Sequence, residues 1–357
     1  MITQAVFIVI EKHMYSSLKK IEQELIHKGI DVKLFFFPNH SPFDFMWRLK
    51  NQRQYFAKLR TLANEQLKDI DDKCLIFFSC GEGFEVSNQD KWLPEKFKKS
   101  KKIAIQHGVF TTSDLKKGEN KLSHSIRQLI NNGTNLIFDF NILGRGFGGT
   151  KFDYYIVYAQ KYKQHLLESR GWKAESVLIS GLSLKDITIK PVPKNSKNQE
   201  TALLLLQDIA FAKITTESKS FEYLDTIVAQ LKNCYKTVKI RLHPKMERAK
   251  YDNYFKSYDN VTVTNTTLED DLKEVDTAFS YVSTTLIDAF LMGVPVVGIL
   301  IPEIDSHDYS FLKQGVNLDN IEFFIKSLKN YDNCTINEEY FDLKDYTKEV
   351  IAELTRA

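Results

Sequence analysis

The sequence predicts an α/β fold with two Rossmann-like, doubly wound domains that face each other across a cleft. Its 357 residues are about twice the length of a typical single domain. Short apolar segments rich in β-branched residues alternate with amphipathic segments along most of the chain, as in parallel α/β sheets. A polar stretch over residues 185–200, which contains Pro191 and Pro193, interrupts this alternation. We therefore expect an N-terminal domain at residues 1–184, a linker at 185–200 and a C-terminal domain at 201–357.

The N-terminal domain begins with a strand, a helix and a second strand. An apolar run at residues 5–10 predicts a buried strand, and apolar residues at helical spacing predict a helix over 16–28, ending before Gly29. The second strand is expected at 32–37, and such a unit requires a parallel sheet with a right-handed crossover. Further strands are expected at residues 74–79, 102–105, 154–158 and 177–180, with a helix at 160–169.

The same alternation restarts after the linker. We expect helices over residues 221–232 and 285–292, and strands over residues 202–206, 238–242, 261–264, 276–281 and 294–299. In doubly wound sheets, ligands bind beyond the carboxyl ends of the strands. Side chains that directly follow these strands are therefore the candidates for functional residues.

The composition is that of an ordinary globular protein and excludes several classes. Hydrophobic residues make up 43% of the chain, and the formal net charge of +3 is too balanced to indicate nucleic-acid binding. The four cysteines have no metal-ligand spacing, and neither a signal peptide nor a transmembrane segment is apparent, so a cytoplasmic location is expected. The basic run at residues 96–102 predicts a solvated loop or, alternatively, a peripheral contact with anionic lipid of the inner membrane.

Two motifs of the C-terminal domain predict a phosphate site. The sequence RLHP (residues 241–244) follows a predicted strand, and the imidazole of His243 can donate to a phosphate oxygen or protonate a leaving phosphate. Ser283, Thr284 and Thr285 form a turn that begins a helix, where hydroxyls and N–H groups favour an anion. Each motif also has a plainer interpretation: a loop histidine in the first case and a helix cap without a ligand in the second.

Three more side chains that follow predicted strands are candidates for acid–base or nucleophilic chemistry. Either His107 or Glu82 could remove a proton from an acceptor hydroxyl, although Glu82 could instead pair with a lysine. Asp208 could contact a sugar or act as a nucleophile, and a turn carboxylate is the alternative. The acidic run at residues 269–271 is expected to supply charge at a helix N-terminus, so no metal site is predicted.

The order of these motifs resembles that of bacterial surface-polysaccharide transferases with the GT-B fold. The chain contains QHG at residues 106–108, then the polar linker, RLHP, the serine/threonine turn and GVPVV at 293–297. This group includes capsule Kdo transferases, CMP-sialic acid transferases and CDP-glycerol glycerophosphotransferases. The resemblance covers most of the chain as architecture, and it is motif-specific over residues 104–110, 240–245 and 280–298.

The resemblance implies a role for each motif. It implies that the nucleotide phosphate is bound by Arg241, His243, Pro244, Ser283, Thr284 and Thr285. It also implies a general base in the first domain, which corresponds to Glu82 or His107. The match departs from the sialyltransferase pattern at Gly81, where an acidic residue is usual, and from the glycerophosphotransferase pattern at Gln106, where an aromatic residue is usual. The QHG sequence is closer to that of the capsule Kdo transferases.

The function implied is transfer of a nonulosonic acid, such as Kdo or sialic acid, from a CMP-sugar onto a capsule or lipooligosaccharide glycan. The partners would be a nucleotide-sugar donor and a glycan or glycolipid acceptor, with no bound cofactor and no metal held by the protein. Three alternatives remain open. They are a CDP-glycerol- or CDP-ribitol-dependent polyol-phosphate transferase, a UDP-sugar 2-epimerase and a non-catalytic nucleotide-binding subunit.

Overall fold

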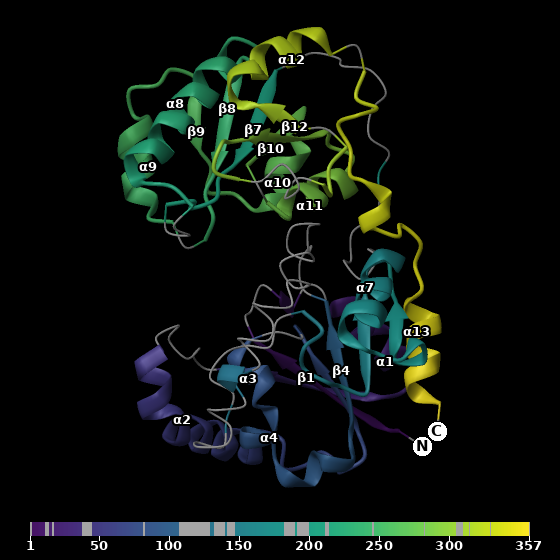
Figure 1. Cartoon of the computed structure of the whole chain (residues 1–357). Helices are drawn as coiled ribbons and strands as arrows, with labels where there is room; N and C mark the ends of the chain where they lie inside the picture. Colours follow the sequence, from purple (N-terminus) through teal and green to yellow (C-terminus); the bar gives the residue numbers. More distant parts are fainter. Residues whose placement is uncertain are drawn as a thin grey trace. The chain divides into compact units, whose positions relative to one another are not determined.

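The structure of the chain is a computed structural model that divides into two compact units (Figure 1). Unit 1 contains the described residues up to Gly181 together with a C-terminal segment that begins at Glu338, and unit 2 contains those from Lys190 to Asn337. The structure describes residues 2–10, 14–15, 18–37, 45–80, 83–106, 129–131, 140, 147–181, 190, 200–210, 214–244, 246–281, 283–304, 310–313, 315–328 and 330–356.

Unit 1 is built on a six-stranded parallel sheet with the order β2-β1-β3-β4-β5-β6. Its strands are β1 (Gln4–Val9), β2 (Asp31–Phe36), β3 (Leu75–Phe78), β4 (Lys101–Ile105), β5 (Tyr154–Val157) and β6 (Val177–Ile179). All of β3 and nearly all of β1 are buried. Central parallel strands are covered on both faces, which explains why these two segments are continuously apolar rather than alternating.

The helices of unit 1 are α1 (Lys19–His27), α2 (Phe45–Gln66), α3 (Phe84–Ser87), α4 (Gln89–Trp92), α7 (Gln160–Arg170) and α13 (Thr347–Thr355). Helix α2 was not predicted from the sequence. It buries Phe56, Leu59 and Ala63 at helical spacing, but Arg48 and Gln52 of the same face are buried as well. These polar residues weaken the hydrophobic periodicity that would have indicated the helix.

Unit 2 is built on a second six-stranded parallel sheet, with the order β12-β11-β10-β7-β8-β9. Its strands are β7 (Thr201–Leu205), β8 (Thr237–Arg241), β9 (Val261–Val263), β10 (Thr277–Ser280), β11 (Val296–Leu300) and β12 (Gly315–Asn317). Its helices are α8 (Glu217–Lys232), α9 (Arg248–Phe255), α10 (Leu268–Lys273), α11 (Thr285–Leu291) and α12 (Ile321–Ser327). Both sheets have the strand order of doubly wound α/β domains, as predicted.

The C-terminal segment corrects the expected domain boundary. Residues 338–357 were assigned to the second domain, but the structure places the segment with unit 1, where α13 packs against α1 (Figure 1). Helix α13 buries Val350, Ile351 and Leu354, so its apolar side chains contribute to the core of unit 1. Apart from residues 190 and 200, the predicted linker lies outside the described residues.

Candidate functional site

The candidate site lies at the carboxyl ends of the central strands of unit 2. From β7, the sheet continues through β8 and β9 on one side and through β10, β11 and β12 on the other. The direction of winding therefore reverses between β7 and β10. In doubly wound sheets this switch point leaves a crevice beyond the strand ends, and it is the usual place for a ligand.

The strand register places the ends of β10, β7 and β8 at one level. Leu205 of β7 pairs with Ser280 of β10 on one side and with Arg241 of β8 on the other. The buried Ser280 hydroxyl also donates to the Leu205 carbonyl at 2.7 Å, which ties the two strands together at this level. Polar residues two or three positions after these aligned strand ends therefore lie next to one another at the carboxyl edge of the sheet.

A hydrogen bond joins two of these residues across the switch point. The side-chain amide of Gln207 donates to Ser283 Oγ at 2.9 Å, and the Thr285 N–H donates to the same oxygen at 3.2 Å. Ser283 is only 2% exposed. A hydroxyl has two acceptor positions and one donor; these two bonds use the acceptor positions, and the Ser283 O–H donates to no group in the described part of the chain.

The N–H groups in the first turn of α11 form more hydrogen bonds within the turn than the sequence suggested. Besides the Thr285 N–H, the Leu286 and Ile287 N–H groups donate to the carbonyls of Ser283 and Thr284 at 3.1 and 3.0 Å. These three amides therefore already have partners within the turn. The hydroxyl of exposed Thr284 and that of half-buried Thr285 remain as candidate donors to an anion.

Arg241 has partners within unit 2. Its guanidinium donates to Asp271 Oδ2 at 2.8 Å and to the Thr266 carbonyl at 2.9 Å. The fully buried carboxylate of Asp271 also accepts from the hydroxyls of Thr264 and Thr266, both at 2.7 Å. Arg241 thus fixes α10 against β8 and β9. The acidic run at 269–271 lies in the first turn of α10, as predicted, and Thr267 caps the N-terminus of this helix.

His243 and Asp208 follow the adjacent strands β8 and β7, and both are half-buried. The turn after β8 is closed by a hydrogen bond from the Met246 N–H to the His243 carbonyl at 2.9 Å, and Pro244 in this turn is exposed. Burial and the charge of Asp208 raise the pKa of Tyr251 to about 12. The charge of Asp208 therefore acts on the Tyr251 phenol of α9.

Sequence reasoning missed Glu303, which follows β11 at the same edge of the sheet. Its carboxylate accepts from the Tyr223 hydroxyl at 2.7 Å and pairs with Lys219 at 2.5 Å, which ties this loop to α8. Burial alone would raise the pKa of Glu303, but the hydrogen bonds from Lys219 and Tyr223 lower it overall. The position of Glu303 shortly after a buried strand is the sequence signal that could have identified this residue. Gln207 was recognised only as the neighbour of Asp208.

The predicted bases His107 and Glu82 lie outside the described residues, so their roles stay predictions. Next to His107, Gln106 is fully buried and links β4 to β5. Its N–H donates to the Ile156 carbonyl at 2.8 Å, and its Oε1 accepts from the Tyr158 N–H at 3.2 Å. Gln106 of the QHG sequence is therefore held inside the sheet.

The basic run at residues 96–102 is partly used within unit 1. The Lys96 ammonium donates to three carbonyls just after α2, at 2.7, 2.9 and 2.7 Å. Lys101 donates to two carbonyls at the end of α13, at 3.2 and 2.9 Å, and Lys98 pairs with Glu95 at 2.5 Å. Positive charges at helix C-termini are favourable. These contacts leave fewer charges of the run for anionic lipid, and a membrane contact stays a prediction.

Among the residues that the structure describes, no three His, Cys, Asp or Glu side chains come together in a group that could hold a metal ion. No helix of those ranges combines the length and the apolarity needed to span a bilayer. The four cysteines are free thiols.

Comparison with known proteins gives the fold. No protein-family profile and no curated protein sequence matches the chain. Similar solved structures include S. aureus MnaA with UDP, at 13% identity over 98% of this chain and 95% of that one, with a TM-score of 0.61. UDP-GlcNAc 2-epimerase from Neisseria meningitidis bound to UDP-GlcNAc matches at 12% identity over 98% and 99%, with a TM-score of 0.55. The glycotransferase of kitacinnamycin matches at 10% identity over 92% of each chain, with a TM-score of 0.53. The two parallel sheets and these similarities confirm the predicted class of two Rossmann-like domains of GT-B type.

Replacing Asp271 by Asn should destabilise unit 2, because the Arg241 guanidinium loses its charged partner. Removing one member of a buried pair costs about 3–5 kcal/mol, and we expect the lower end of that range because the Arg241 side chain is 28% exposed. The free energy of unfolding in urea would measure the change. Glu269→Gln, an exposed change in the same helix, should leave it within about 0.5 kcal/mol. Unchanged stability of Asp271→Asn would contradict the structural role given to Arg241.

Proposed function

We propose that the chain is a glycosyltransferase that binds a nucleotide-sugar donor at the switch point of unit 2. The hydrogen bond between Gln207 and Ser283 is the observation that supports this most directly. It fixes a buried hydroxyl, with its O–H left to donate, at the place where doubly wound sheets bind phosphorylated ligands. S. aureus MnaA, which has a similar fold, was solved with UDP, and this agrees with a nucleotide ligand for the present chain.

The residues around this position suit a departing phosphate. Ser283, Thr284 and Thr285 would donate to its oxygens, and the imidazole of His243 would donate a hydrogen bond or a proton. Donors fixed where negative charge develops lower the barrier most effectively, because they need no reorganisation during the reaction. His107 or Glu82 of unit 1 would remove the proton from the acceptor hydroxyl that attacks the anomeric carbon. The nucleotide monophosphate then leaves with the electrons of the broken glycosidic bond.

The finer assignment rests on the resemblance of the motifs. It favours a CMP-linked nonulosonic acid, such as Kdo or sialic acid, as donor and a capsule or lipooligosaccharide glycan as acceptor. The enzyme would act in the cytoplasm, where activated sugars are made. A UDP-sugar 2-epimerase is the second candidate, because two of the solved structures described above contain UDP or UDP-GlcNAc. An epimerase would form its product without any acceptor, whereas a transferase requires one.

A nucleotide panel should identify the donor class. CMP, CDP, UDP and GDP would each be added to the full chain, and the thermal unfolding midpoint would be measured. A ligand present at 100 times its Kd stabilises a protein by about 2.7 kcal/mol, and we expect the largest shift from a cytidine nucleotide. Ser283→Ala should reduce this shift.

Ser280→Ala is the matched control for that experiment, because it removes another buried hydroxyl that ties β10 to β7. It should lower stability to a similar extent and keep the nucleotide shift. Equal shifts from all four nucleotides would remove the cytidine assignment. Loss of the shift in both variants alike would remove the special role of Ser283.

Replacing His243 by Ala should lower turnover far more than stability, because the side chain follows β8 rather than filling the core. Loss of one donor to the developing charge typically reduces kcat by about 100- to 1,000-fold. The measurement is sugar transfer with the donor that the panel identifies, together with the free energy of unfolding. His27→Ala, which changes an exposed histidine of α1, should have normal activity. A nearly normal rate for His243→Ala would rule out the proposed role.

The pair His107→Ala and Glu82→Gln should identify the general base. With saturating donor and acceptor, loss of the base should reduce kcat by about 100- to 10,000-fold while donor affinity changes little. His107 is the first choice, because the ordinary histidine pKa of about 6.5 suits proton abstraction near neutrality. If both variants retain full kcat, neither residue is the base. Asp208 would then be tested as a nucleophile by trapping a covalent intermediate.

A further inference from the structure

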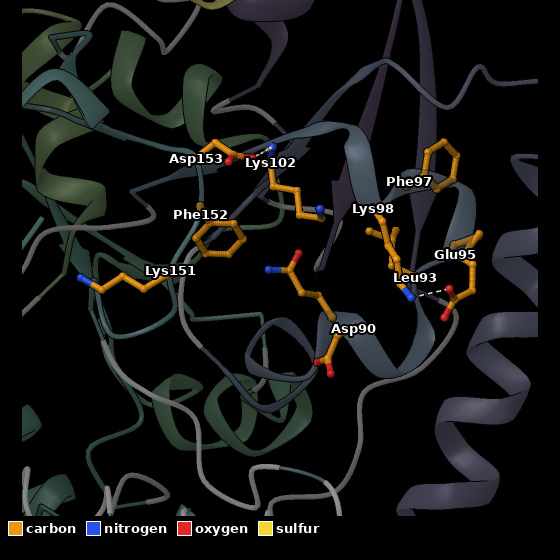
Figure 2. A pocket seen from close by; sticks show the side chains of 11 residues that line it. Asp90, Leu93, Glu95, Phe97, Lys98, Lys102, Lys151, Phe152 and Asp153 are labelled. Carbon is orange, nitrogen blue, oxygen red and sulfur yellow. Dashed lines mark hydrogen bonds and ion pairs between the residues drawn. The ribbon is translucent and has the colours of Figure 1, made fainter. Parts of the chain in front are cut away.

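A pocket of about 430 Å³ lies in unit 1, away from the carboxyl edge of its sheet (Figure 2). Lys102, near the start of β4, forms part of its wall, as do the residues 151–153 that directly precede β5. In a parallel sheet all strands begin at one edge and end at the other. The pocket is therefore at the amino edge, opposite the edge where β4 ends before His107. Its volume suits a ligand of the size of a small sugar derivative.

Two of the three carboxylates of the pocket are paired with lysines of unit 1. Glu95 pairs with Lys98 at 2.5 Å, and Asp90 pairs with Lys91 at 3.1 Å. One carboxylate oxygen of Asp153 accepts the backbone N–H of Lys102 at 2.7 Å. Asp90 and Glu95 are thus paired with lysines, whereas Asp153 is hydrogen-bonded but keeps its negative charge.

Two lysines of the pocket differ in whether their ammonium groups have hydrogen-bond partners. Lys151 donates to the Arg170 carbonyl at 2.6 Å and lies 5.0 Å from the ring of Trp172, while burial and the charge of Arg170 lower its pKa. The ammonium of Lys102, in contrast, has no hydrogen bond or ion pair to any part of the chain that the structure describes. Figure 2 shows it extending into the pocket beside the ring of Phe152.

Two further groups of the wall complete the arrangement. Gln89 lines the pocket, and its side-chain Oε1 is buried without a hydrogen-bond partner in the described part of the chain. Leaving such an atom unpaired costs about 1–3 kcal/mol, so a rotation of the Gln89 side chain that lets a ligand hydroxyl donate to Oε1 would be favoured. Phe152 supplies an apolar surface beside these polar groups, held in place by its contact with Phe78 at 5.2 Å between ring centroids.

We propose that this pocket binds a phosphate ester of a sugar or other polyol, at a site separate from the proposed donor site. The phosphate would accept from the Lys102 ammonium, a hydroxyl would donate to Gln89, and the carbon skeleton would pack on Phe152. A bare inorganic anion would use only the first contact, and a neutral sugar only the other two. A phosphate ester of a polyol satisfies all three groups together.

The test uses the full chain and glucose 6-phosphate as the probe, with binding measured by calorimetry at low salt. Because the proposed phosphate site of unit 2 would also take a phosphate ester, the readout is dependence on Lys102 rather than binding alone. Lys102→Gln removes the charge and should weaken binding by roughly 10- to 100-fold, as expected for a hydrogen bond to a charged group. Lys99→Gln, an exposed lysine of the same basic run that does not line the pocket, should leave affinity unchanged.

Two additional arms make the result decisive. Gln89→Leu leaves β4 unaltered and should also weaken binding, so the test does not depend on the folding of one variant. Vesicles of phosphatidylglycerol, compared with phosphatidylcholine vesicles, distinguish a lipid headgroup from a free ester as the source of the phosphate. Binding in either arm that depends on Lys102 supports the proposal. Equal affinities of wild type, Lys102→Gln and Gln89→Leu in both arms would overturn it, as would an equal loss in Lys99→Gln.

Discussion

The register of β7 with its two neighbours is the constraint on which the candidate site depends. Leu205 is aligned with Ser280 on one side and with Arg241 on the other, so the polar residues that follow all emerge at one level. A slip by one residue would turn every side chain of β7 to the opposite face. The fully buried Ala202, Leu203 and Leu204 oppose such a slip, because alanine and leucine differ in volume and each would have to fit the space packed around its neighbour. Apolar packing of the strand interior thereby fixes the positions of polar groups beyond its end.

Much of the fold could be predicted from the sequence, because central parallel strands are buried on both faces and appear as continuous apolar runs. The eleven predicted strands are all present, each within about two residues of the expected ends. The edge strand β12 could not be predicted in this way, since Gly315-Val316-Asn317 contains a single apolar residue. Nor could local periodicity assign α13 to a unit, because an apolar helix face does not specify which core will bury it.

The candidate site could be predicted only as a set of positions. The strand ends indicated Asp208, His243 and the turn at Ser283, and these follow β7, β8 and β10, which are neighbours in one sheet. The partners of each side chain depend on residues far away in the sequence. Arg241 is held by Asp271, 30 positions later, and Ser283 by Gln207, 76 positions earlier. A motif therefore identifies the chemistry of a side chain, but it does not show whether that side chain is already bonded to another part of the protein.

The return of α13 to unit 1 means that unit 2 is inserted within unit 1 rather than appended to it. Val350, Ile351 and Leu354 belong to the core of unit 1 but are translated after all of unit 2. During translation, unit 1 therefore cannot complete its core until unit 2 has been synthesised. Until then, the surface that α13 covers is exposed to water. The core of unit 1 is thus the first to begin forming, but the core of unit 2 is the first that can be completed. Single-domain expression of unit 1 would require the two separated segments to be joined.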